Sequence, residues 1–180
     1  MKIKNVITTL ILLIVLCLLP VVIKNYNRYH IGPTYEGTVA DGIDFKKAGY
    51  PPFIDLVYGV SGPEPWGRWT DANESRKDSV ASFIFNKSLP DSFILELQAT
   101  AFGPNHNTPI AIRVGNTTKK FTVTEPSFQT FYIDFDNVGD QNIIDIIPPH
   151  PTTPNSTNSQ SADFRRLGIG MVYLKIKAKE

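Results

Sequence analysis

The chain has 180 residues, a length that suits one domain with a hydrophobic core and is too short for two domains of ordinary size. Its 18 basic and 17 acidic side chains give a formal net charge of +1. Because the basic residues are scattered rather than gathered in a stripe, the sequence argues against nucleic acid as a partner.

An uncharged apolar run occupies residues 6–23, with lysines on both sides. As a helix rising about 1.5 Å per residue, this run would be about 27 Å long, close to the roughly 30 Å of hydrocarbon in a bilayer. It is longer than the roughly 7–15 apolar residues of a cleaved signal, and no small-x-small cleavage site follows Ile23. We therefore predict a membrane anchor over residues 1–23.

The part of the chain after the anchor is expected to lie outside the cytoplasm. A short N-terminal tail and a long polar remainder favour an N-in, C-out orientation, and the lack of cysteine in that remainder suits a bacterial periplasm. The single cysteine, Cys17, lies within the apolar run, so the remainder must fold without disulfides. Residues 24–37 are polar and contain Gly32-Pro33, which predicts a juxtamembrane linker, and the domain proper is expected at 38–180.

Strand signals dominate the predicted domain. The clearest covers residues 93–101, where apolar side chains occupy every second position. Shorter alternating runs occur at 110–114, 121–123, 131–135 and 167–176, and residues 148–163 form a proline-rich polar surface loop. No window outside the anchor sustains a helical apolar period. The sequence therefore predicts an all-β domain, and its short strands favour a two-sheet, jelly-roll-like sandwich over a closed barrel.

Both tryptophans lie in one short segment, residues 61–71. Its prolines and glycines predict a constrained loop or strand entrance. The segment holds five candidate carbohydrate-binding residues: Glu64, Trp66, Arg68, Trp69 and Asp71.

Two readings of this segment stay open. In the first, indole rings stack on the apolar face of a sugar and the charged side chains bond its hydroxyl groups. In the second, Trp66 and Trp69 plug one end of the sandwich and Arg68 pairs with Glu64 or Asp71. The odd spacing of the tryptophans predicts opposite faces, with one indole buried and the other partly open.

A second candidate site is the Gly-Pro-Asn turn after residue 101, where Asn105 and His106 would line a polar surface or simply form a turn. The three histidines have no metal-ligand spacing, so we expect no metal and no cofactor. Motifs of nucleophilic catalysis are absent from the sequence, and we predict a protein that is not an enzyme. Hydrolysis by paired carboxylates stays open, since sequence does not give their separation in space.

Four stretches in the same order carry a family resemblance: SGPEPWGRWTDAN (61–73), LPDSFILELQATAFGPN (89–105), IAIRVGN (110–116) and RRLGIGMVYLKIK (165–177). Together they resemble the C-terminal accessory domain of phosphoglycerol transferase I, a membrane enzyme that decorates osmoregulated periplasmic glucans, and similar domains of other envelope glycan enzymes. The resemblance implies a periplasmic β-sandwich of carbohydrate-binding type. It does not imply the transferase reaction, because the family's chemistry resides in a separate metal-binding domain.

The leading hypothesis is a non-catalytic, membrane-anchored periplasmic domain that binds envelope carbohydrate or supports a glycan-modifying enzyme. The alternative is a structural protein-interaction module, a detached subunit of a glycan transferase complex. Exposure of the two indoles separates these hypotheses, because open indoles favour sugar and fully buried indoles leave only protein contact.

Overall fold

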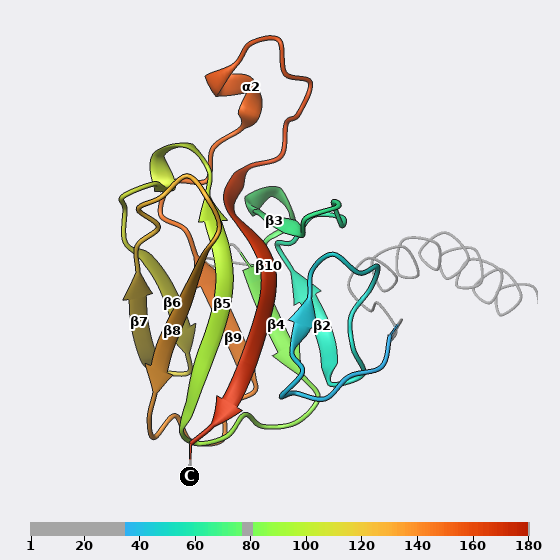
Figure 1. Cartoon of the computed structure of the whole chain (residues 1–180), viewed down its shortest axis with the longest axis vertical. Coiled ribbons are helices and arrows are strands. Elements are labelled where there is room, and N and C mark those ends of the chain that lie inside the picture. The colour runs from blue at the N-terminus through green and yellow to red at the C-terminus, as the bar shows by residue number, and fades with distance from the viewer. Residues whose placement is uncertain (1–34, 77–80, 180) are drawn as a thin grey trace, which may run out of the picture.

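The computed structural model describes residues 35–76 and 81–179, which form two antiparallel five-stranded sheets. One sheet has the strand order β1-β10-β5-β8, with β3 also paired to β10 (Figure 1). Its strands are β1 (Ile43–Asp44), β3 (Arg68–Asp71), β5 (Phe93–Ala101), β8 (Gln129–Phe135) and β10 (Leu167–Ala178). We call it the first sheet.

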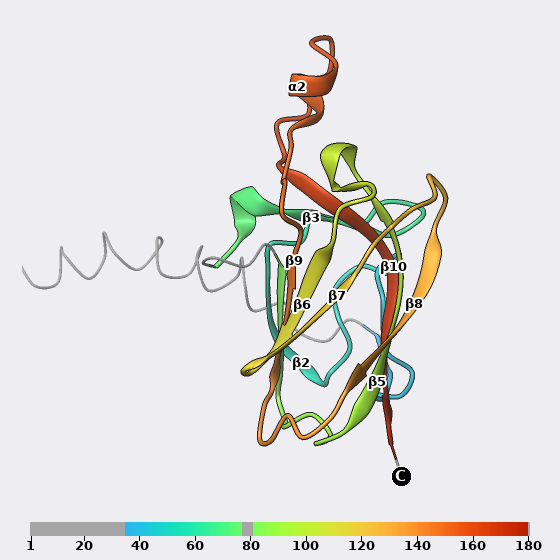
Figure 2. The same cartoon turned by 90° about the vertical axis from the view of Figure 1, so that its left-hand side faces the viewer.

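The second sheet has the order β2-β4-β9-β6-β7. Its strands are β2 (Ile54–Tyr58), β4 (Ala81–Phe85), β6 (Ile110–Val114), β7 (Thr117–Phe121) and β9 (Ile143–Ile147). Figure 2 shows the two sheets edge-on as separate layers. From β4 onward the chain crosses between the layers at every step except the β6–β7 hairpin.

The hydrophobic core lies between the two layers. It is built from fully buried side chains of both sheets, among them Phe83, Leu95, Leu97, Ile112, Ile144 and Met171. Every second residue of β5 and β6 points into it, as the pleat of a strand requires. Within the described residues, every buried side-chain nitrogen or oxygen has a hydrogen-bond partner. The all-β, two-sheet prediction is confirmed.

Three short helical segments complete the described structure: η1 (Ala72–Glu74), η2 (Gly103–Asn105) and α2 (Pro154–Thr157). The predicted surface loop at 148–163 contains α2 and stands away from the sandwich (Figure 1). Its base is closed by a β-bridge between Thr152 and Leu167.

The structure contains the predicted strands where one face of the strand is polar, because only there do apolar and polar residues alternate in the sequence. The strand predicted at 93–101 is β5, and those at 110–114, 131–135 and 167–176 correspond to β6, β8 and β10. The run predicted at 121–123 is misplaced, because β7 ends at Phe121 and Val123 is buried in the following loop. Strand β9, with the sequence IIDII, carries apolar residues on both faces and therefore lacks the alternation.

The membrane anchor predicted over residues 1–23 and residues 24–34 of the predicted linker lie outside the described residues. Across 35–76 and 81–179, no helix is long and apolar enough to cross a membrane.

Candidate functional site

The two tryptophans meet over a glycine on the outer face of the first sheet. Trp69 belongs to β3 and lies opposite Gly170 of β10. A β-carbon at Gly170 would lie 2.8 Å from Cη2 of Trp66 and 3.1 Å from Cζ3 of Trp69. Only a residue without a side chain leaves room for both indoles here. The missing side chain at Gly170 therefore leaves space for both indole rings to pack against the outer surface of the sheet.

Two phenylalanines extend this pair into a cluster of four rings, which we call the aromatic cluster: Trp66, Trp69, Phe102 and Phe128. The indoles meet edge to face with centroids 5.0 Å apart, Phe128 lies 5.3 Å from Trp66, and Phe102 lies 5.7 Å from Trp69. Edge-to-face and tilted pairs at such distances are favourable. None of the four rings belongs to the core between the sheets, and Phe128 is 38% exposed.

The predicted split between a buried and an open indole is wrong, since both indoles are half-buried and share one face. The reason is a tight turn at Trp66. Glu64 N donates to Gly67 O at 2.7 Å, and Gly67 N donates to Glu64 O at 3.1 Å. Trp66 is therefore a turn residue rather than part of an extended strand, and alternation along the strand does not reach it.

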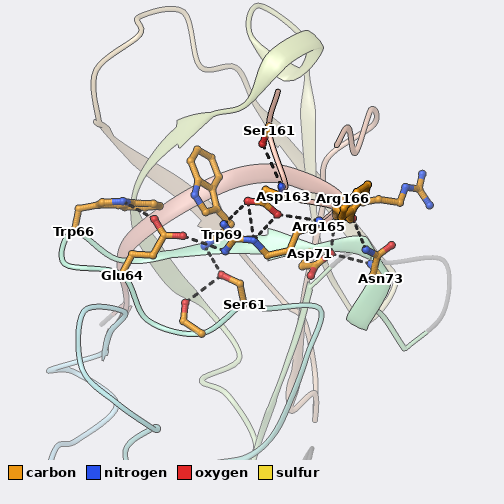
Figure 3. Close-up of polar contacts among 12 residues, drawn as sticks. Ser61, Glu64, Trp66, Trp69, Asp71, Asn73, Ser161, Asp163, Arg165 and Arg166 are labelled. Carbon is orange, nitrogen blue, oxygen red and sulfur yellow. Dashed lines mark hydrogen bonds and ion pairs between the residues drawn. The ribbon is translucent and has the colours of Figure 1, made fainter. Parts of the chain in front are cut away.

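A hydrogen-bonded chain of charged groups holds Trp66 (Figure 3). Trp66 Nε1 donates to Glu64 Oε2 at 3.0 Å, and Arg165 Nη1 donates to Glu64 Oε1 at 3.0 Å. Arg165 also forms an ion pair of 2.6 Å with Asp163. The hydrogen bonds from Arg165 lower the pKa of Asp163, and the bonds to Asp163 and Glu64 raise the pKa of Arg165. Arg165 was not among the predicted site residues, because nothing in the sequence relates it to Glu64.

Arg68 faces the opposite way from its neighbour Trp69 and does not contact the aromatic cluster. It is 4% exposed, and its guanidinium donates to the carbonyl oxygens of Phe45 (3.3 Å), Lys47 (2.7 Å) and Gly49 (3.2 Å) and to the hydroxyl of Tyr50 (3.3 Å). Burial raises the pKa of that tyrosine to about 12, so its hydroxyl stays neutral. The expected pairing of Arg68 with Glu64 or Asp71 is therefore wrong.

The Asp71 side chain is also engaged in hydrogen bonds with the backbone. Its Oδ1 accepts hydrogen bonds from the backbone nitrogens of Asn73 and Arg166, both at 3.0 Å, and it caps η1. It is 4% exposed. A pocket of about 410 Å³ lies beside it, lined by Val60, Ser61, Gly62, Asp71, Glu74 and Arg165.

The second predicted site is also mainly structural. Asn105 is fully buried, and its side chain donates to the carbonyls of Phe102 and His150 and accepts from His150 N at 3.0 Å. It thereby ties η2 to the start of the 148–163 loop. His106 is half-buried at the end of η2. No three metal-ligating side chains gather anywhere in the described part of the chain.

A larger pocket of about 590 Å³ lies away from the aromatic cluster. It is lined by residues 37–39, 52–53 and 85–90. None of the predicted site residues contributes to it, so the candidate site rests on the aromatic cluster alone.

Comparison with known protein families and proteins identifies relatives of this chain. Residues 34–178 match the model of the Domain of unknown function DUF7024. The chain belongs to this family. The DUF7024 domain is also 37% identical over 137 residues to phosphoglycerol transferase I from Citrobacter koseri, Salmonella paratyphi B and Salmonella typhi. The resemblance seen in the sequence is thereby confirmed.

The matches to the transferases cover only a small part of each enzyme. The matched segment covers 76% of this chain and 17% of each transferase, so the DUF7024 domain is related to one part of a much longer enzyme. Among solved structures, BiXyn10A CBM1 APO superimposes with a TM-score of 0.43 and 14% identity, covering 79% of this chain and 100% of that chain.

Proposed function

We propose that this protein is a non-catalytic envelope protein whose domain binds carbohydrate through the aromatic cluster and so supports a glycan-modifying enzyme. The observation that carries the proposal is the position of the four rings. They lie on the outer face of a sheet, outside the core, with Phe128 38% exposed and both indoles half-buried. Partly exposed aromatic rings grouped in this way mark a binding surface.

The chemistry of the cluster suits sugars. A sugar ring has an apolar face that packs on an aromatic ring, and hydroxyl groups at its rim that need hydrogen-bond partners. Glu64 lies beside Trp66, and Arg165 brings a guanidinium to the same point. Because Arg68 and Asp71 are engaged with the backbone, we assign the polar contacts to Glu64 and Arg165 instead.

The relatives support an envelope glycan as the ligand, since the matched enzymes are phosphoglycerol transferases. The strand arrangement supports the jelly-roll-like reading of the sandwich. Without the edge strands β2 and β3, the remaining eight of the ten strands form two four-stranded layers, β1-β10-β5-β8 and β4-β9-β6-β7, with frequent crossings, as in a double-sheet jelly roll.

A glycan-array screen tests the proposal. The full chain, held in a detergent without sugar headgroups, would be screened beside its Trp66→Ala variant, with Tyr58→Ala on the second sheet as an aromatic control. We expect binding by the wild type and the control, and loss of binding by Trp66→Ala. A wild-type chain that binds no glycan would refute carbohydrate binding.

We further propose that residues 6–23 anchor the chain in a bacterial inner membrane, with a linker at 24–37 and the domain at 38–180 in the periplasm. The apolar run and the relation to an envelope enzyme support this topology. In a Gram-negative host, the protein should stay in the inner membrane at full length, with its C-terminus protected until the outer membrane is opened. A shortened, soluble periplasmic product would contradict the anchor.

The alternative, a protein-interaction module, is favoured by a different surface. On the outer face of the second sheet, Leu56, Ile84 and Ile143 are in register and half-buried. A pull-down from an envelope extract, repeated with Ile84→Ser, would lose its partner if this surface docks a protein.

A further inference from the structure

The outer face of the first sheet carries more than the aromatic cluster. Strand β5 points Glu96, Gln98 and Thr100 toward this face, between β8 and β10, and neighbouring side chains cover Glu96 and Thr100, which are 7% and 8% exposed. Thr100 lies in register with Gly170, which seats the two indoles, and Glu96 lies in register with Tyr132 of β8. At about 3.3 Å per residue, the four-residue step from Thr100 to Glu96 spans about 13 Å. The face is therefore longer than one sugar ring.

A tyrosine lies across the middle of this face. Tyr173 comes from β10, and its hydroxyl donates to Glu96 on β5 at 2.9 Å and lies 3.4 Å from the hydroxyl of Thr130 on β8. Since β5 lies between the other two strands, the Tyr173 side chain reaches across β5. Two hydrogen bonds fix its ring, so this ring is a preorganised surface for stacking.

A second tyrosine, Tyr132 of β8, lies on the same face. It is 64% exposed, whereas Tyr173 is half-buried. The side chain of Gln98 is half-buried beside Tyr173 and Thr130, and it makes no hydrogen bond within the described residues. An amide carries both donors and an acceptor, which matches the dual character of a sugar hydroxyl.

Most charges along the same face are paired, and the remaining lysine, Lys175, places its Nζ 5.1 Å from the centroid of the Tyr173 ring. Lys177 pairs with Glu96 at 2.5 Å, and Lys179 lies 2.9 Å from Asp134 and 2.8 Å from Asp136. A ligand that lies over these groups meets fixed rings and hydrogen-bonding groups rather than a field of one sign. This favours an uncharged glycan chain over a polyanion.

We propose that the outer face of the β1-β10-β5-β8 sheet is a binding track for an extended, uncharged glycan chain, which runs along β5 from the aromatic cluster past Tyr173 to Tyr132. This inference rests on the proposed carbohydrate binding and deepens it. The aromatic cluster holds one sugar unit, and the two tyrosines hold further units. Gln98 contacts a hydroxyl group between them.

The track predicts that affinity depends on ligand length. Calorimetric titration of the full chain in sugar-free detergent would use β-linked glucose oligosaccharides from disaccharide to octasaccharide. We expect the octasaccharide to bind at least about tenfold more tightly than the disaccharide. Tyr132→Ala should weaken octasaccharide binding by about tenfold, as is usual for an aromatic anchor, and leave disaccharide binding unchanged. Tyr58→Ala on the second sheet should change neither.

The outcomes separate this inference from the proposed function. If Trp66→Ala abolishes binding while Tyr132→Ala and ligand length have no effect, the track is wrong and carbohydrate binding by the aromatic cluster stands. If the glycans of the array that bind the chain are anionic and their affinity falls steeply with added salt, the track as proposed is wrong. If the wild-type chain binds no oligosaccharide of the series and no glycan of the array, the proposed function itself fails.

Discussion

Arg165 and Glu64 are 101 positions apart in the chain, yet Arg165 Nη1 donates to Glu64 Oε1 at 3.0 Å. The same carboxylate accepts the indole N–H of Trp66 at 3.0 Å. The last residues before β10 therefore hold the turn that carries the first tryptophan. Because Arg165 also pairs with Asp163 at 2.6 Å, it links the end of the 148–163 loop to the aromatic cluster.

Arg165→Gln should loosen Trp66 without unfolding the domain. The Arg165 and Glu64 side chains are 34% and 29% exposed, so the ion pair itself contributes little, about 0–1 kcal/mol. We expect a red shift of tryptophan emission and weaker glycan binding, with a melting temperature within a few degrees of wild type. Arg113→Gln, which breaks the 2.8 Å pair with Asp145 on the second sheet, is the matched control. Unchanged emission in Arg165→Gln would show that Glu64 alone positions the indole.

Trp66→Ala and Trp69→Ala should each cost an intermediate amount of stability. A fully buried tryptophan replaced by alanine costs about 3–5 kcal/mol, but both indoles here are only half-buried and lie outside the core. We therefore expect about 1–3 kcal/mol for each, from chemical denaturation. Severe instability of both variants would identify the indoles as structural plugs and favour the interaction-module hypothesis.

Arg68→Ala should destabilise the domain far more than the replacement of an exposed arginine by alanine would. It would leave the carbonyls of Phe45, Lys47 and Gly49 without their donor in a site that is 4% exposed. We expect a loss of about 3 kcal/mol or more in the free energy of unfolding. Arg68→Lys should recover only part of it, because an ammonium group cannot reproduce the fork of the guanidinium. A variant as stable as Arg113→Ala would contradict the structural role assigned here.

Acid should weaken the domain partly through Glu96. Its hydrogen bond from Lys177, together with that from Tyr173, lowers the pKa of Glu96 below the ordinary value of 4.5. A carboxyl group with a lowered pKa in the folded state contributes stability above pH 4.5, and this contribution is lost as the pH falls through the folded value. When melting temperatures are measured from neutral to acid pH, those of Glu96→Gln should therefore fall less steeply below pH 4.5 than those of the wild type. Parallel curves for the two proteins would mean that Glu96 is not linked to folding.

Residues 38–180, produced without the apolar segment, should fold alone in reducing conditions. This part of the chain contains no cysteine, so packing between the two sheets must hold it together. We expect a β-type circular dichroism spectrum and one cooperative unfolding transition that reductant does not alter. A helical spectrum, or folding that is lost in reductant, would contradict this expectation.

The sequence by itself determined the fold class and most strands of the first sheet. In β5, β8 and β10 the alternation of side chains was visible because apolar side chains face the core and polar ones face out. Strand β9 was missed because isoleucines occupy both of its faces. The candidate region was also visible, since both tryptophans fall in one proline- and glycine-rich segment.

Only the tertiary structure decided what each residue in that segment does. The Glu64–Gly67 turn puts both indoles on one face, and the pairing of β3 with β10 seats them over Gly170 and sends Arg68 inward. Arg165 reaches Glu64 only because β10 returns beside β3. Alternation in a strand is local and can be read from neighbouring residues. The side a residue faces after a turn, and the partner it meets, depend on chain segments that lie far apart in the sequence.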